Sequence, residues 1–280
     1  MTIRIVTDST CDLPSEIVEE HGISVVPLYI HIGSESYLDG VDITRQEFYT
    51  RLPEYDAFPQ TAVPGPQQFS DVYARLAGEG ATEILSIHIS PSLSAVVNSA
   101  RIAADSFEAA KVTVLDSGQL SLGLGFMTET AARAAASGKP LPEIISMVQN
   151  QIKRSYVFAA LETTEFLRRS GRVSGFQNGV GTLLQIKPLL KMHDGVVGSE
   201  RVRTSKKAFA RLIELVEEIS PIERLALVHT GDSEAAQALW QQARHLFPAI
   251  HDPISVNVTP VIGAHIGPGV AGFACLAAAE

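Results

Sequence analysis

The sequence predicts an α/β protein of two domains, with a mostly parallel sheet in the N-terminal domain and mixed α+β structure in the C-terminal domain. In the first half, apolar strands alternate with helical segments at short intervals, which is typical of βαβ units. In the second half, Asp194-Gly195 lies between two strand-like segments and indicates an antiparallel hairpin. We place the boundary near residue 155, so the predicted domains are residues 1–155 and 156–280.

Start and stop signals define the elements of the first half. Asp12 is expected to cap the first helix, and Thr44-Arg45-Gln46-Glu47 matches a capping box that begins the second. Three prolines and a glycine between Phe58 and Pro66 exclude a helix or a central strand, so we expect an irregular loop around Thr61. The predicted strands are 3–6, 23–32, 83–89 and 111–115, and further helices are predicted at 66–78, at 95–107, up to 137, and at 141–154.

In the second half, the predicted strands and helices do not alternate regularly, because two of the strands form a hairpin. Its hairpin turn is His193-Asp194-Gly195, and a glycine-rich loop region is expected at 171–181. The predicted strands are 155–161, 187–192, 196–202, 224–229 and 255–259, with helices at 164–169, at 206–219 and between the last two strands.

Composition excludes several classes of protein. The formal net charge of −9 over 280 residues argues against binding to nucleic acid or to an anionic membrane surface. Cys11 and Cys275 are the only cysteines, which excludes a disulfide scaffold or a cysteine zinc site. The start of the chain shows no secretory signal, and the apolar stretch Val270–Ala279 is about half the length that spans a bilayer. We therefore expect a cytoplasmic protein.

Hydroxyl-rich turns follow three of the predicted strands: Thr7-Asp8-Ser9-Thr10, Ser90 to Ser94, and Asp116-Ser117. Ligands of open α/β sheets bind at the carboxyl ends of the strands, and hydroxyls and helix-start N–H groups there can bind an anion. If the strands are neighbours, the turns converge on one crevice. The alternative is that these residues only cap helices, because Ser, Thr and Asp are the preferred caps.

Two further segments could contribute to a site. Thr61 lies in the proline-rich loop, which could cover the crevice or serve only as a rigid connector. His265 lies in the glycine-rich segment 263–269, where backbone can approach a ligand closely, although a lone histidine is often structural. The chain contains no Gly-x-x-x-x-Gly-Lys-Ser/Thr sequence, which disfavours a P-loop nucleotide site.

Basic residues gather in two short segments of this acidic chain. Such clusters indicate a patch for an anionic group or partner, although they also occur on solvated helix starts. The first segment holds Arg168, Arg169 and Arg172, and the second holds Arg201, Arg203, Lys206 and Lys207.

Common enzyme signatures are missing. Asp8-Ser9-Thr10 lacks the second carboxylate of a haloacid-dehalogenase-type phosphatase, and no Gly-x-Ser-x-Gly elbow is present. The histidines lack metal-ligand spacing, with His229 to Asp232 as a weak exception. We therefore predict neither a cofactor nor a metal.

Seven ordered motifs across the chain resemble the DegV family, whose members are the fatty-acid-binding subunits of a bacterial fatty acid kinase. The motifs are 7–14, Thr61 with 64–66 and Phe69, 87–94, 114–117 with 123–125, 170–174, 201–204, and 260–269. This sequence departs from the family at Ser94-Ala95-Val96, where Ser-Gly-Thr is usual, and at Thr61-Ala62-Val63-Pro64, where Thr-Ser-Gln-Pro is usual. Ser170 also replaces a glycine.

The resemblance implies two α/β domains with an acyl chain between them. It implies that Thr61 and Ser94 hold the carboxylate and that His265 lies nearby. We expect Asp8, Ser9, Ser90, Ser117 and Gly263 to support the site. Arg172 and Arg203 would face an ATP-dependent kinase subunit, which phosphorylates the bound acid to an acyl phosphate. The chain would then be a lipid-binding subunit and not an enzyme. The alternatives are a small phosphotransferase or lipid hydrolase that uses Asp8 or His265, and a regulatory protein that only senses lipid.

Overall fold

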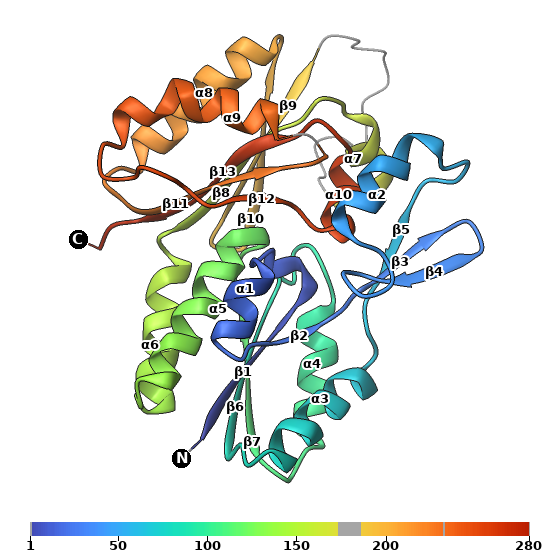
Figure 1. Ribbon diagram of the computed structural model, residues 1–280, viewed down its shortest axis with the longest axis vertical. Helices are drawn as coiled ribbons and strands as arrows, with labels where there is room; N and C mark the ends of the chain where they lie inside the picture. Colours follow the sequence, from blue (N-terminus) through green and yellow to red (C-terminus); the bar gives the residue numbers. More distant parts are fainter. Residues whose placement is uncertain (1, 173–185, 232, 280) are drawn as a thin grey trace.

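The computed structural model describes residues 2–172, 186–231 and 233–279, which form three sheets with helices around them (Figure 1). A four-stranded sheet has the order β2-β1-β6-β7, and all its strands are parallel. Helices α3 and α4 cover one of its faces and α5 and α6 the other (Figure 1). Its strands are β1 (Ile3–Asp8), β2 (Ser24–Val26), β6 (Glu83–His88) and β7 (Lys111–Asp116). The helices are α1 (Ser15–Glu20), α3 (Pro66–Gly78), α4 (Val96–Asp105), α5 (Ser121–Ala136) and α6 (Leu141–Ile152).

A small antiparallel sheet projects from this half. Its order is β4-β3-β5, and helix α2 lies close to it (Figure 1). Its bounds are β3 (Tyr29–Ile32), β4 (Glu35–Leu38) and β5 (Gln60–Ala62), and those of the helix are α2 (Arg45–Arg51). Thr44 caps α2 as predicted, because its hydroxyl accepts a hydrogen bond from Glu47 N at 3.1 Å, while the Glu47 carboxylate pairs with Arg51.

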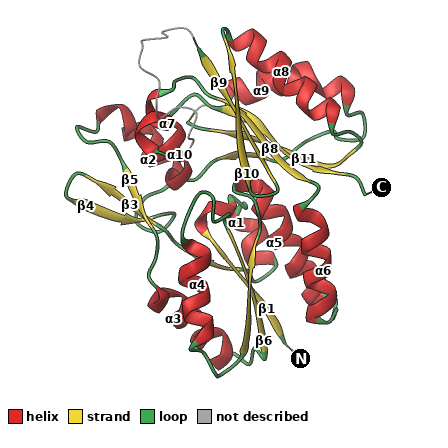
Figure 2. Ribbon diagram, turned by 180° about the vertical axis from the view of Figure 1, so that it is seen from behind, coloured by secondary structure: helices red, strands yellow, loops and turns green. Residues whose placement is uncertain are grey.

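The second half is built on a six-stranded mixed sheet with the order β10-β9-β8-β13-β11-β12. Helices α8 and α9 cover its outer face, and its other face is turned toward the first half (Figure 2). The strands are β8 (Ser155–Ala160), β9 (Lys187–His193), β10 (Val196–Val202), β11 (Ile222–His229), β12 (Ser255–Asn257) and β13 (Ala271–Ala277). The helices are α7 (Glu165–Ser170), α8 (Ser205–Glu218), α9 (Glu234–Ala243) and α10 (Pro260–Ile266).

Every strand of the six-stranded sheet starts at Ser155 or later, and the strands of the other two sheets end before residue 155. The hydrophobic core does not divide there. Val157, Met192 and Val228 belong to the same buried cluster as Phe69 and Leu124 of the first half. Because strand side chains alternate between faces, Phe158 and Leu227 point to the opposite side and pack against α8 and α9.

The predicted hairpin is confirmed. Strands β9 and β10 pair antiparallel, with His193 opposite Val196. Asp194 and Gly195 both have positive φ, at 45° and 75°, which is the requirement of a tight two-residue hairpin turn. Most predicted strands and helices are found within a few residues of their expected ends.

Three local predictions were wrong. Asp12 does not cap α1, because its carboxylate makes contacts far away in sequence. The single strand predicted over 23–32 is two strands in different sheets, because Pro27 interrupts it between β2 and β3. Thr61 lies in the short edge strand β5 and not in an irregular loop.

A buried polar cluster joins the two halves next to the start of α10. The Asp12 carboxylate accepts hydrogen bonds from Thr259 N at 2.7 Å and from the Ser121 hydroxyl at 2.5 Å. The Thr259 hydroxyl donates to Asp39, and Arg45 lies 3.5 Å from Asp12. Both carboxylates are almost fully buried, and this burial raises the pKa of Asp39 to about 6. The cluster thus fixes the first residue before α10 with groups from the first half.

We expect Asp39→Asn to flatten the pH dependence of stability. The pKa of Asp39 is raised above its unfolded value, so its contribution is fully present below pH 3.8 and is lost as the pH rises through about 6. The wild-type chain should therefore lose on the order of 3 kcal/mol more unfolding free energy over this window than the variant. Urea denaturation at several pH values from 4 to 7 gives the unfolding free energy of both proteins. The same change of unfolding free energy with pH in the two proteins would contradict the prediction.

Candidate functional site: an apolar cavity with one polar end

A cavity of about 320 Å³ lies between the two halves of the molecule. The six-stranded sheet supplies one wall, with Val157, Ala159 and Val228. The opposite wall comes from the first half and includes Leu28 and Ile89. Most lining side chains are aliphatic, so the cavity suits an apolar ligand or ligand segment.

Helices α7 and α10 bring polar groups to one part of this wall. His265 is in the last turn of α10, and its Nε2 lies 2.8 Å from the Thr61 hydroxyl on β5. Arg172, two residues after the end of α7, lines the same cavity and is exposed to solvent. Ser94 also lines the cavity, just before α4, and its hydroxyl makes no hydrogen bond to another described residue.

The electrostatics keep His265 neutral. Burial, and then the positive charge of Arg172, lower the pKa of His265 from 6.5 to about 4. Its Nδ1 is buried and has no hydrogen-bond partner among the described residues. In the tautomer with the proton on Nε2, the imidazole donates to Thr61, and the threonine hydroxyl can then donate into the cavity. Thr61 and Ser94 can therefore offer two neutral donors to an anionic head group.

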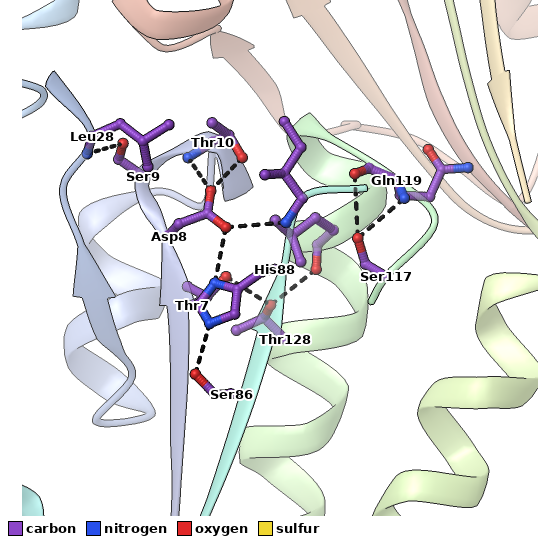
Figure 3. A network of polar contacts seen from close by, with 12 residues as sticks. Thr7, Asp8, Ser9, Thr10, Leu28, Ser86, His88, Ser117, Gln119 and Thr128 are labelled. Carbon is purple, nitrogen blue, oxygen red and sulfur yellow. Dashed lines mark hydrogen bonds and ion pairs between the residues drawn. The ribbon is translucent and has the colours of Figure 1, made fainter. Parts of the chain in front are cut away.

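The polar residues at the strand ends form a network of contacts with one another and with nearby backbone (Figure 3). Asp8 is completely buried and accepts hydrogen bonds from Thr10 N, His88 Nδ1 and Ile89 N, each at 3.0 Å. Strands β1, β6 and β7 are neighbours, as the prediction of one crevice required. Of the polar residues in these turns, Thr10 and Ser94 line the cavity and the others do not.

The residues predicted to support the site lie behind its wall. Ser9 accepts a hydrogen bond from Leu28 N, and Ser117 exchanges hydrogen bonds with the backbone of Gln119. The Ser90 hydroxyl contacts that of Ser92. Gly263 lies against the Tyr49 ring, and a side chain at 263 would collide with it, so glycine lets α2 and α10 approach closely. None of these residues lines the cavity.

The two arginines predicted to face a partner occupy different places. Arg172 lies at the cavity, next to the polar end. Arg203 is exposed in the turn between β10 and α8 and does not line it. Val173, Ser174 and most of the predicted loop 171–181 lie outside the described residues, as does Asp232 of the weak histidine–aspartate pattern.

Sequence reasoning missed the largest part of the site, its apolar wall. Alternation in Ser155–Ala160 shows that two faces exist, but Val157 and Ala159 look no different from core residues. Helix α10, which carries His265, was also missed, because Gly263 lies within it and Gly267 and Gly269 follow it. Among the described residues, no cluster of three His, Cys, Asp or Glu side chains could hold a metal, and no helix is long and apolar enough to cross a membrane.

Comparison with known proteins places this architecture in one family. Residues 2–278 match the model of the DegV family, described as uncharacterised proteins. A DegV domain-containing protein of Deinococcus radiodurans is 37% identical over 279 residues, covering 98% of each chain. A fatty-acid-binding DegV structure from Thermus thermophilus has a TM-score of 0.90 and 35% identity, covering 99% of this chain and 100% of that one. DegV from Bacillus subtilis, described as a fatty acid binding protein, has a TM-score of 0.88 and 29% identity, covering 99% of each.

We expect His265 to remain neutral throughout the physiological pH range. Because burial is the main cause of its lowered pKa, its ring resonances in NMR spectra should stay constant from pH 8 to pH 5. Arg172→Gln should raise the pKa of His265 but leave it below 6.5, since the charge of Arg172 is the smaller cause of the lowering. A measured pKa near 6.5 for His265 in the wild-type protein would contradict the prediction that this histidine stays neutral.

Proposed function

Since the chain belongs to the DegV family, we propose that it binds a long-chain fatty acid through its carboxylate and presents it to an ATP-dependent kinase subunit. One observation carries the first part. A mostly aliphatic cavity has two neutral hydroxyls, Thr61 and Ser94, and a neutral histidine among the polar groups of its wall. The fatty-acid-binding proteins of T. thermophilus and B. subtilis share this fold over nearly their full length, which supports the assignment.

The expected energetics suit a carrier. Hydrogen bonds from Thr61 and Ser94 to a carboxylate contribute about 3–6 kcal/mol together. A tail of about 14 methylenes contributes on the order of 11 kcal/mol gross when it leaves water. The tail therefore supplies most of the affinity. The hydroxyls determine which end of the molecule lies beside Arg172 and solvent.

Neutral donors also suit a carboxylate that must react later. An arginine that clamped both carboxylate oxygens would hold them away from an incoming phosphoryl group. In this cavity the arginine side chain donates instead to a backbone oxygen, from Arg172 Nη1 to Ser170 O at 2.5 Å. We infer that the hydroxyls leave one face of the carboxylate open toward the solvent side.

The enzyme alternative has less support. Asp8, its proposed nucleophile or base, is completely buried, does not line the cavity and already accepts several hydrogen bonds. With a pKa of about 4, His265 is a weak base at neutral pH. These observations favour a carrier that depends on a partner for chemistry. The purified chain should then show no turnover with ATP and Mg²⁺ alone.

We expect Thr61→Ala combined with Ser94→Ala to weaken fatty-acid binding at neutral pH. Loss of both hydroxyls should cost about 3 kcal/mol, roughly 150-fold in Kd, because the carboxylate then lacks its donors. Displacement of a fluorescent fatty acid measures it. Ser92→Ala is the matched control, since Ser92 lies in the same turn as Ser94 but outside the cavity wall. Unchanged affinity in the double variant would refute the head-group assignment.

We expect Arg203→Glu to separate binding from presentation. Arg203 is exposed and outside the cavity, so fatty-acid affinity should stay at the wild-type value. Acyl phosphate formation by the partner kinase should fall at least about tenfold, since charge reversal in a contact replaces attraction with repulsion. Arg101→Glu is the control, because Arg101 is also exposed but lies on α4. Equal rates for the two variants would argue against Arg203 as a partner contact and would favour a protein that only senses lipid.

A further inference from the structure

The pairing of β8 with β9 marks positions along the cavity. Ala159 is opposite Leu190, and Val157 is opposite Met192. Ala159 and Leu190 pack near Leu167 of α7, at the end that carries Arg172. The Val157–Met192 pair is two residues farther along both strands, which is about 7 Å away from α7. All four residues line the cavity, so it extends from its polar end toward Met192.

Hydrogen bonds close the cavity behind Met192. Gln119 is completely buried, and its side-chain amide donates to Ser155 O at 2.7 Å and to Met192 O at 3.2 Å. Beside it, Gly195 N donates to Gly118 O at 2.9 Å, so the β9–β10 turn is held against the loop before α5. An acyl chain that passed this point would have to leave these buried groups without partners, which is costly. Among the described residues, these hydrogen bonds form a floor at the far end of the cavity.

Met192 is the side chain on this floor that can most easily change its shape. It is 3% exposed and belongs to the core cluster on the cavity side of the sheet. Methionine is unbranched and has several rotatable bonds, so it fills irregular gaps. Leu120, at the start of α5, and Val197, its partner across the hairpin, line the cavity around it.

We propose that Met192 sets the length of the fatty acid that this protein accepts, with Leu120 and Val197 as the walls around it. The inference rests on the proposed function, because a floor measures a tail only when the carboxylate is held at the other end. Each methylene that the cavity buries should strengthen binding about fourfold. A chain that reaches Met192 should gain nothing from further methylenes, so affinity should peak at one length and then fall.

Competition between saturated acids tests this. The protein is incubated with an equimolar series from decanoic to arachidic acid, and native mass spectrometry gives the occupancy of each. The wild-type chain should show one maximum. Met192→Ala removes the γ-methylene, the sulfur and the ε-methyl group, and should move the maximum about two to three carbons longer. Met192→Phe keeps the floor filled with a bulkier side chain and should move the maximum to shorter acids.

Leu189→Ala is the matched control. Leu189 is also fully buried in β9, but it points to the opposite face and packs with α8. The Leu189→Ala substitution should lower stability but leave the preferred acyl length unchanged. If Met192→Ala fails to fold, a change of preferred acyl length in Met192→Phe still tests the proposal. Wild-type binding with the same maximum in both Met192 variants overturns the length inference and leaves the proposed function standing. A wild-type protein that binds no acid overturns both.

Discussion

The buried carboxylate of Asp12 is the contact on which the arrangement of the two halves depends. It joins the turn after β1 to the residue before α10, to the start of α5 and to Arg45 on α2. A charge with no exposure is costly, and burial raises the pKa of Asp12, while the arginine and the two hydrogen bonds act in the opposite direction. Removing one partner of such a buried charge typically costs 3–5 kcal/mol, so we regard the cluster as a rigid joint.

The consequence of this joint is the position of α10. Because Thr259 is fixed at the helix start, His265 in the last turn is placed opposite Thr61 of the small sheet. Tyr49 supports the same segment by donating from its hydroxyl to Val258 O at 3.1 Å, and Gly263 leaves room for its ring. Thus a histidine and a threonine that are 204 residues apart in sequence become one polar end of a cavity.

The cavity stays open because its walls are built from elements that cannot collapse independently. Strands β8, β9 and β11 each have hydrogen-bonded neighbours on both sides, and α8 and α9 pack against their outer face. At the centre of this sheet, Gly272 lies so close to β8 that a side chain would collide with the Phe158 carbonyl. A sheet supported in this way can present a smooth aliphatic face without filling the space in front of it.

The sequence by itself determined the alternation of strands and helices, the hairpin at Asp194-Gly195, the helix start at Thr44 and the family, because these depend on local chemistry and ordered motifs. It could not show that Asp12 binds Thr259, 247 residues away, instead of capping the first helix, since the same carboxylate can accept either hydrogen bond. Nor could it show which apolar residues line the cavity, because Val157 and Val148 are equally apolar, and only packing decides which borders open space. Tertiary structure also decided that the Ser9 and Ser117 hydroxyls bind backbone groups. It likewise decided that Thr61, Ser94 and His265 share one cavity, because burial and direction follow from contacts between distant segments.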